Sequence, residues 1–406
     1  MELAKTQCTI CESEKLTEIL ELGNFPPANF LTKYENDSVE KLNLTLMSCD
    51  FCGHLQQKYF FQPEKLFNNY LYQSGTSKTL DDFFHEIAEI TTKSLDRGSD
   101  ILELACNDGT FLEKLSDKGF NVVGVDPAKN ILEYAIKRGL KVFQGYWPIN
   151  LNKKFDAIYA FNVLAHVTNP ISFFEGALSH LKDTGYLAIQ TSQIRMIENA
   201  EFDTIYHEHY SFFTKSSLNY LAIKYKLNIS IFETSVHGGS ALAIFTKNNN
   251  TTCILQSIRD EIGVNFIKNE FLHLSKKHEA NDLNIFKEKC YNFKSRINNI
   301  ISEQINKGRK IVFVGAAAKT VTVLFYSNVN VDYIVDEAPL KVNKFIPVTN
   351  IKISPFNAVS LIEEDCFFII GAWNFYEELK SKIYKIRSMN NSKDVYFTYF
   401  PQERFD

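Results

Sequence analysis

The stretch Ile101-Leu-Glu-Leu-Ala-Cys-Asn-Asp-Gly109, followed by Val122-Val-Gly-Val-Asp-Pro127, decides the fold of this chain. An apolar run leads into a turn of small residues, a helix-forming segment follows, and a second apolar run ends in an acid. This order is typical of a nucleotide-binding α/β unit, in which the turn lets the backbone approach a ligand and the acid binds a ribose diol. We therefore expect a ligand-binding βαβ unit near residue 100.

The turn of this unit lacks the G-x-G-x-x-G pattern of dinucleotide sites. Glu103, Ala105, Asn107 and Gly109 instead fit the E-x-G-x-G-x-G pattern of S-adenosylmethionine (SAM) methyltransferases, with two glycines replaced. SAM has no pyrophosphate, so a turn that is poor in glycine and carries Asn and Asp suits it better than a dinucleotide. The turn predicts SAM, and the alternatives are NAD and a buried βαβ unit without a ligand.

The length, composition and charge of the chain exclude several classes of protein. The 406 residues are enough for two or three domains, and 45% hydrophobic with 14% aromatic residues indicates a packed globular chain. A net charge of -4 gives no electrostatic case for nucleic acid. The longest apolar runs are too short to span a bilayer, and the opening Met-Glu-Leu-Ala-Lys is not a signal peptide. We expect a cytoplasmic monomer that binds neither nucleic acid nor membrane.

Two cysteine pairs near the N-terminus have the spacing of a zinc site. Cys8, Cys11, Cys49 and Cys52 form C-x-x-C … C-x-x-C, whereas the other four cysteines are scattered among apolar neighbours. Four thiolates can complete a tetrahedral zinc and leave no position for water, so this metal would fold a small module and do no chemistry. Disulfides are the alternative, which a cytoplasmic location disfavours.

Strand-like and helix-like segments alternate from residue 101 to residue 191, which predicts a mostly parallel sheet with helices on both faces. A second unit of the same layout begins at Lys310-Ile-Val-Phe-Val-Gly-Ala-Ala-Ala-Lys319 and reaches an acid at Asp336. The expected fold class is α/β, with a small N-terminal zinc-binding module, a central Rossmann-like SAM methyltransferase domain and a C-terminal Rossmann-like domain. The expected boundaries are 1–75, 76–250 and 307–406, with a helical connector over 251–306.

Tyr206-His-Glu-His209 is the densest cluster of titratable side chains in the chain. It follows the fifth strand expected in the SAM unit, and ligands of such sheets bind at the carboxyl ends of the strands. Its four side chains could include a general base, an orienting carboxylate and a phenol that polarises a carbonyl. Metal binding by His207 and His209 and a polar surface loop are the alternatives. The neighbouring SAM turn favours catalysis.

Two further histidines are candidates. His166 follows the fourth expected strand, where a side chain can face the substrate, but its apolar neighbours also fit a buried structural histidine. His237-Gly-Gly-Ser240 places two glycines beside a His and a Ser, as expected where the backbone approaches a ligand closely. A hairpin turn explains this second motif equally well.

Taken in order, these motifs resemble those of the sugar-nucleotide C-methyltransferases, SAM enzymes that methylate a ring carbon of 4-keto deoxysugars such as the tetronitrose precursor. The resemblance covers nearly the whole chain and adds three motifs, Tyr70-x-Tyr72-x-Ser74, Asp336-x-x-Pro-Leu-Lys341 and Ala372-Trp-Asn-Phe375. It implies a structural zinc in the N-terminal module and SAM in the central domain. The substrate, a nucleotide-linked keto sugar, would lie between the domains.

The resemblance also implies roles for individual residues. A 4-keto group acidifies the proton on C3, a base removes it, and the enolate carbon takes the methyl group. By the resemblance His209 is the base, Glu208 orients or assists it and Tyr206 steadies the enolate oxygen. His166 completes the catalytic set by binding the sugar or shielding the site. The residues implied in SAM binding are Glu103, Ala105, Asn107, Asp108, Gly109, Asp126, Pro127 and Asn162. Those implied around the sugar are Tyr70, Tyr72, Ser74, His207, His237, Gly238 and Ser240.

One departure from the family pattern leaves the acceptor open. The family usually carries an Arg two residues after His-Gly-Gly-Ser, where this chain has Leu242. We expect methyl transfer to a ring carbon, C3, of a nucleotide-linked 4-keto sugar. A SAM-dependent sugar O-methyltransferase and a non-catalytic sugar-nucleotide-binding protein are the alternatives. An NAD-dependent reductase is disfavoured by the missing G-x-G-x-x-G.

Overall fold

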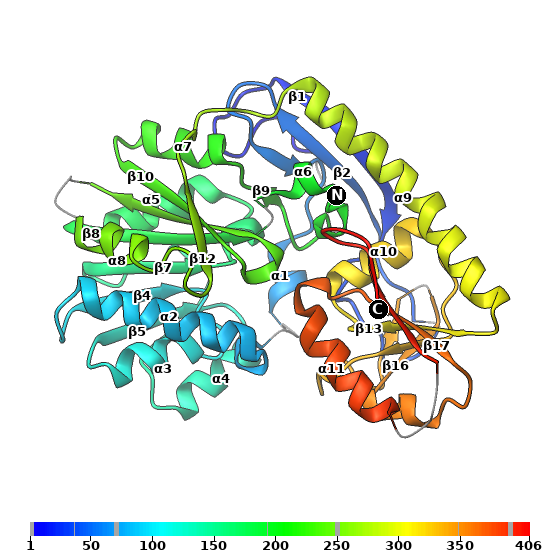
Figure 1. Cartoon of the computed structure of the whole chain (residues 1–406). Helices are drawn as coiled ribbons and strands as arrows, with labels where there is room; N and C mark the ends of the chain where they lie inside the picture. Colours follow the sequence, from blue (N-terminus) through cyan, green and yellow to red (C-terminus); the bar gives the residue numbers. More distant parts are fainter. Residues whose placement is uncertain are drawn as a thin grey trace.

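The computed structural model describes residues 4–35, 37–68, 73–192, 194–247, 252–347, 349–388 and 393–406. These residues form three β-sheets (Figure 1). In this view the N-terminal strands lie at the top, the central sheet at the left and the C-terminal sheet at the lower right, with the long helix α9 (Ala280–Asn306) along the right-hand side. The expected α/β class is confirmed.

The central sheet has eight strands in the order β12-β10-β11-β8-β7-β4-β5-β6. The strands from β8 to β6 run parallel, and β11, β10 and β12 add an antiparallel edge. After β4 the chain adds β5 on one side of that strand and later adds β7 on its other side. The strand order therefore reverses between β4 and β7, and ligands of open α/β sheets bind at such a topological switch point. The strands are β4 (Asp100–Leu104), β5 (Asn121–Asp126), β6 (Val142–Gln144), β7 (Phe155–Phe161), β8 (Leu181–Ser192), β10 (Asn228–Thr234), β11 (Ser240–Thr246) and β12 (Ile267–Phe271).

Helices cover both faces of this sheet, because its strands are apolar on both sides. Phe83, Phe111 and Ile258 pack α2, α3 and α8 on one face, and Phe174 and Leu221 pack α5 and α7 on the other. The helices are α2 (Lys78–Ser94), α3 (Thr110–Asp117), α4 (Lys129–Lys137), α5 (Pro170–His180), α7 (Lys215–Lys224) and α8 (Thr252–Arg259). The alternation expected over 101–191 is present in this order.

The expected helical connector over 251–306 differs from the structure. It contains α8, then β12, then α9, and β12 pairs with β10 at the edge of the central sheet. Only Ile267 of β12 is fully buried. A short strand with one buried side chain has no apolar alternation to distinguish it from a polar helix, and its pairing with β10 decides its conformation.

The N-terminal sheet is antiparallel, in the order β1-β2-β3-β9. Three strands belong to the first 57 residues, and the fourth follows the Tyr206-His-Glu-His209 turn directly. The strands are β1 (Leu16–Phe25), β2 (Leu42–Cys49), β3 (Leu55–Gln57) and β9 (Ser211–Phe212). Leu55 pairs with Phe212, so the expected zinc module is completed by a later part of the chain.

The C-terminal sheet has seven strands in the order β15-β16-β14-β13-β17-β18-β19. Its parallel centre repeats the strand, turn and helix order of the central unit, as the sequence predicted. The strands are β13 (Lys310–Val314), β14 (Tyr333–Val335), β15 (Phe345–Ile346), β16 (Ile351–Ser354), β17 (Cys366–Ile370), β18 (Val395–Thr398) and β19 (Arg404–Phe405). Its helices are α10 (Ala318–Ser327) and α11 (Tyr376–Arg387).

Helix α9 joins the N-terminal and C-terminal sheets into one hydrophobic core. It buries Phe286, Cys290, Phe293, Ile297 and Ile301, which recur at helical spacing along one side. This side packs in a single cluster with residues of β1, β2, β13 and β17. The short elements are α1 (Pro63–Phe67), α6 (Met196–Asn199), η1 (Ser74–Thr76), η2 (Leu164–His166), η3 (Phe202–Thr204), η4 (Val236–Gly238), η5 (Phe356–Leu361) and η6 (Trp373–Phe375). Across the described ranges, no helix combines the length and apolarity that crossing a membrane requires.

Candidate active site

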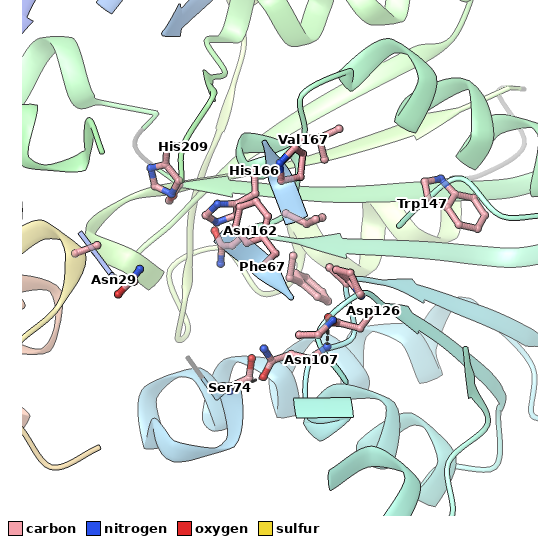
Figure 2. Close-up of a pocket in the computed structure, with 18 of the residues that line it drawn as sticks. Asn29, Phe67, Ser74, Asn107, Asp126, Trp147, Asn162, His166, Val167 and His209 are labelled. Carbon is pink, nitrogen blue, oxygen red and sulfur yellow. Dashed lines mark hydrogen bonds between the residues drawn. The ribbon is translucent and has the colours of Figure 1, made fainter. Parts of the chain in front are cut away.

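A cavity of about 500 Å³ opens at the carboxyl ends of β4, β5 and β7, where the three sheets meet. Its volume is in the usual range for a small-molecule site. The central unit contributes most of the wall, α1 closes one side, and the turns after β13 and β17 close another. Figure 2 shows Asn107 of the turn after β4 and Asp126 of β5 in one part of the cavity, with His166 and His209 in another.

The turn after β4 has the backbone shape that its composition predicts. Ala105, Asn107 and Gly109 all have positive φ, of 58°, 51° and 80°. A Cβ on Gly109 would lie 2.6 Å from Leu140, so glycine is required there on two grounds. Ala105 and Asn107 line the cavity, which means that the two replaced glycines still leave the backbone open to a ligand.

Asp126 fixes this turn from the end of β5. Its carboxylate accepts hydrogen bonds from the amides of Asn107 (2.9 Å) and Ala128 (2.8 Å). Burial raises the pKa of Asp126 to about 6. Pro127, next to it, lines the cavity, as does Asn162, whose amide donates to Gln190 at 3.1 Å.

The turn is rich in carboxylates. Burial, followed by the nearby charges of Asp108 and Asp126, raises the pKa of Glu103 well above its usual value, and its Oε2 has no hydrogen-bond partner among the described residues. Asp108 accepts a bond from the Gly75 amide at 2.9 Å, and Asn107 accepts one from the Ser74 amide at 2.9 Å. Clustered acids repel a diphosphate and favour a cation. They therefore fit SAM, which carries a sulfonium and an ammonium.

His209 is held as a neutral base within the cavity. Its Nδ1–H donates to the carbonyl of Thr204 at 2.9 Å, which leaves the lone pair on Nε2. The Tyr206 hydroxyl lies 2.8 Å from that Nε2 and donates to it. The resemblance implied that Glu208 orients this imidazole, but in the structure the Thr204 carbonyl does so, and the Glu208 carboxylate instead accepts a bond from the Asn29 amide at 3.0 Å.

His166 stands beside His209, with 4.7 Å between the ring centroids. Its Nδ1–H donates to the main-chain carbonyl of Glu208 at 2.6 Å, and the edge of Phe67 covers its ring. Burial lowers the pKa of His166 to about 4 and that of His237 to about 4. Burial, then the charge of His166, lowers the pKa of His209 well below 6.5. These imidazoles are therefore neutral near pH 7.

The remaining residues predicted around the sugar have different surroundings. His207 is buried and donates to the Leu42 carbonyl at 2.9 Å, so it anchors the turn to β2. His237 lines the cavity in a left-handed conformation, with φ 57°. Ser240 donates to the Val236 carbonyl at 2.7 Å. Ser74 and Tyr206 line the cavity. Tyr70 and Tyr72 lie outside the described residues.

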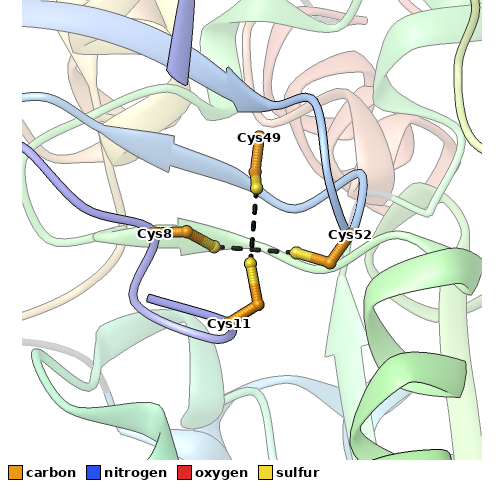
Figure 3. Close-up of side chains that lie close together, drawn as sticks. All are labelled: Cys8, Cys11, Cys49 and Cys52. Carbon is orange, nitrogen blue, oxygen red and sulfur yellow. Dashed lines mark hydrogen bonds between the residues drawn. The ribbon is translucent and has the colours of Figure 1, made fainter. Parts of the chain in front are cut away.

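Four thiols come together at the edge of the N-terminal sheet (Figure 3). The sulfurs of Cys8 and Cys52 are 3.6 Å apart, those of Cys11 and Cys49 are 3.5 Å apart, and all four lie within 4.8 Å of one another. A tetrahedral zinc with Zn–S bonds of about 2.3 Å holds its sulfurs about 3.8 Å apart. The donor set and its spacing fit a closed structural zinc site, as predicted.

The two C-x-x-C pairs have the same backbone conformation. A residue with positive φ follows the second cysteine of each pair, Glu12 with φ 61° and Gly53 with φ 72°. The amides of these residues donate to the carbonyls of Cys8 and Cys49, each at 2.9 Å. Each C-x-x-C pair is thus a tight turn that aims both thiols at one point.

Comparisons with known proteins agree along the length of the chain. Residues 8–67 match a zinc binding domain, residues 72–229 a methyltransferase domain and residues 235–396 a C-methyltransferase C-terminal domain. The C-methyltransferase NovU of Streptomyces niveus is 21% identical over 390 residues, which cover 92% of this chain and 91% of NovU. The chain belongs to the SAM-dependent C-methyltransferases. Its cofactors are SAM and a structural zinc.

Solved structures that resemble this C-methyltransferase cover only part of it. A SAM-dependent methyltransferase of Thermotoga maritima is 21% identical, with a TM-score of 0.34, and covers 42% of this chain and 92% of its own. Magnesium protoporphyrin IX methyltransferase of Synechocystis PCC 6803, solved with bound SAM, is 11% identical, with a TM-score of 0.34, and covers 41% of this chain and 80% of its own.

Several side chains that line the cavity of this C-methyltransferase are not predicted by the sequence. Asn29, Phe67 and Trp147 line it from loops and from α1, which carry no pattern that aims a side chain. Lys319 reaches it from α10. A signal for Lys319 was present, because the lysine opens a helix after a strand and a turn of small residues. Leu242, where the family usually has Arg, is buried in an apolar cluster with Phe161 and Ile244.

Proposed function

We propose that this enzyme transfers a methyl group from SAM to C3 of a nucleotide-linked 4-keto sugar through an enolate. The observation that carries this proposal is the pair of His209 and Tyr206. A neutral imidazole with its lone pair on Nε2 and a phenol 2.8 Å from that nitrogen lie in the same cavity as the SAM turn. O-methylation requires a base as well, but it requires no donor for a carbonyl oxygen.

The proposed reaction has two steps. Bound SAM supplies an electrophilic methyl group. The Tyr206 hydroxyl turns from His209 to the substrate's C4 carbonyl, which frees Nε2 to take the C3 proton. The electron pair of the C3–H bond forms the C3–C4 double bond, and the carbonyl π pair moves to the C4 oxygen. C3 then bonds to the methyl carbon while the C–S pair stays on sulfur. Positioned general-base catalysis of this kind contributes about 10²- to 10⁴-fold.

The proposed place of the substrate's diphosphate is the start of α10. Its N-cap Ala317 makes no side-chain cap hydrogen bond, and Ala317 and Ala318 line the cavity. The ammonium of Lys341 lies against the same turn, 3.0 Å from the Ala316 carbonyl. Helix N-termini attract anions. The turn after β4 carries acids and the equivalent turn after β13 carries alanines, which supports a cationic ligand in the central unit and an anionic one in the C-terminal unit.

The test of the proposed function is hydrogen exchange at C3. The protein is incubated in deuterated water with TDP-, GDP- and CDP-linked 4-keto sugars, with and without SAM, and the products are analysed by mass spectrometry. We expect one deuterium without SAM and one added methyl with SAM. His209→Gln should lose both signals, whereas the exposed control His85→Gln should keep them. A methyl group without exchange would point to O-methylation. Neither signal from any of these sugars would favour a binding role.

A further inference from the structure

Lys319 is a buried cation that no described group neutralises by direct contact. It is the second residue of α10, and its side chain is 8% exposed and lines the cavity. Its Nζ has no hydrogen-bond partner among the described residues. Burial lowers the pKa of Lys319, and the nearby charges of Asp203 and Glu201 oppose this shift and favour the ammonium form. Burial of a charge without a partner is strongly unfavourable. A cation in this state is a candidate binding group for an anion that arrives with the substrate.

The ammonium is held in place by an aromatic ring. It lies 3.7 Å from the centroid of Trp373, a cation–π contact. The indole N–H of Trp373 donates to Asp203 at 2.6 Å, which fixes the ring against η3. Lys319 is therefore positioned from one face by a rigid platform. Its ammonium protons stay available on the cavity side.

The neighbours of Lys319 place it at the reacting end of the cavity. Its charge acts on His209 and His237 and helps to lower the pKa of each, although burial is the larger cause for both. For His209 the charge of His166 also lowers the pKa more than Lys319 does, and the hydrogen bond to the Thr204 carbonyl raises it. Tyr206 lines the same cavity, and its hydroxyl is hydrogen-bonded to His209. Lys341, by contrast, lies against the Asp336 carboxylate at 3.6 Å. The two lysines that line the cavity thus have different neighbours, an aromatic ring for Lys319 and a carboxylate for Lys341.

We propose that Lys319 is a catalytic residue whose ammonium stabilises the C4 oxygen as it becomes an enolate. This inference rests on the proposed function. While the C3 proton passes to His209, negative charge collects on the C4 oxygen, and Lys319 with Tyr206 donates hydrogen bonds to it. Lys319 keeps its protons throughout. When C3 bonds to the methyl carbon, the carbonyl re-forms and the charge on oxygen disappears.

The test uses Lys319→Met, Lys319→Gln and Lys319→Arg in the full-length zinc-loaded enzyme, with the exposed Lys352→Met of β16 as control. The readouts are SAM-free C3 exchange, kcat, KM for the keto sugar, and Kd for SAM. Loss of one oxyanion donor typically costs about 10²- to 10³-fold in kcat. We expect that loss in exchange and in kcat for the two neutral variants, with KM and SAM Kd within about threefold. Lys319→Arg should retain at least tenfold more activity than Lys319→Met.

Three outcomes would overturn the role of Lys319. Exchange within threefold of wild type in both neutral variants would mean that no charge is stabilised. A raised KM with unchanged kcat would mean that the ammonium binds the diphosphate in the ground state. A melting temperature lowered in parallel with activity in both neutral variants, but not in Lys319→Arg, would mean a structural role. Absence of exchange in the wild type would overturn the proposed function and the Lys319 role together.

Discussion

Trp373 lies so close to Gly238 that a Cβ on the glycine would sit 1.9 Å from a ring carbon of the indole. In the sequence, a close approach of backbone to a ligand and a hairpin turn explain this glycine equally well, and the structure shows a close approach to the C-terminal unit. Gly238 also has φ 79°, which favours glycine. The contact joins η4 of the central unit to η6, and it sets the position of the ring that supports Lys319.

Gly238→Ala should destabilise the fold and slow the enzyme, because the indole must move to admit the methyl group. The left-handed backbone alone costs about 1–2 kcal/mol for an alanine, and overpacking adds about 1–3 kcal/mol. Gly263→Ala is the matched control, since Gly263 has φ 81° and nothing within 4 Å of its Cβ position. Thermal and urea unfolding measure the difference. Equal destabilisation of the two variants would show that the contact with Trp373 is not tight.

Removal of zinc should abolish activity even though the metal is remote from the chemistry. Cys11→Ser removes one ligand, and structural zinc contributes about 10–16 kcal/mol in zinc-finger peptides. Because β3 pairs with β9, and β9 begins two residues after His209, unfolding of the N-terminal sheet releases the base. We expect loss of metal by mass spectrometry together with loss of C3 exchange. Cys253→Ser, at an exposed thiol, is the control. A soluble and active Cys11→Ser protein would contradict the structural zinc.

Asp126→Ala should weaken SAM binding about 10- to 100-fold, because a charged acceptor of two amide bonds is lost from the SAM turn. Asp336→Ala is its counterpart in the C-terminal unit. Asp336 accepts from the amides of Ala316 (2.8 Å) and Ala338 (2.7 Å) in the same arrangement. The second variant should lose comparable stability and keep SAM affinity, which calorimetry can measure. A similar loss of affinity in both variants would mean that stability, not the SAM turn, controls binding.

The pH–rate profile should be flat from about pH 8 down to pH 6.5 and fall only at more acidic pH. Burial lowers the pKa of His209 well below 6.5, so the imidazole stays neutral and able to accept a proton in that range. As pH falls through the folded-state pKa, protonation removes the base. The measurement is kcat/KM for methyl transfer against pH, with SAM-free exchange as a second readout. An acid limb with an apparent pKa of 6.5 or higher would rule out a buried neutral His209 as the base.

The sequence predicted the elements whose side chains are buried in a simple pattern. The apolar run from Phe155 to Phe161 predicts a strand, and β7 has these bounds. The segment from Pro170 to Leu181 predicts a helix, and α5 runs from Pro170 to His180. Thr79, which precedes apolar residues at helical spacing, is a candidate helix cap in the sequence. In the structure Ser77 accepts the capping bond from the Leu80 amide, so the helix begins at Lys78. The four cysteines and the glycine turn could be predicted because their chemistry depends on local spacing.

Other features are encoded by no local pattern, because they depend on a main-chain atom or on contacts between distant segments. Thr204 orients His209 through a main-chain carbonyl, a role open to any residue type. Lys319 and Trp373 meet only when α10 and η6 pack together. No pattern within residues 1–75 predicts that α9 merges the core of the N-terminal module with that of the C-terminal sheet. The apolar side of α9 is difficult to recognise in the sequence, because polar residues make up the rest of the helix.

The pairing of β3 with β9 ties completion of the N-terminal sheet to a segment that is synthesised about 150 residues later. As the chain leaves the ribosome, both cysteine pairs emerge early and can take up metal, but β3 keeps an open edge until Ser211 and Phe212 have been made. By then the strands of the SAM unit up to β8 are also available. The last strand of the metal-bound sheet therefore closes in the same event that places His209, and a nascent chain that has bound zinc still lacks its base.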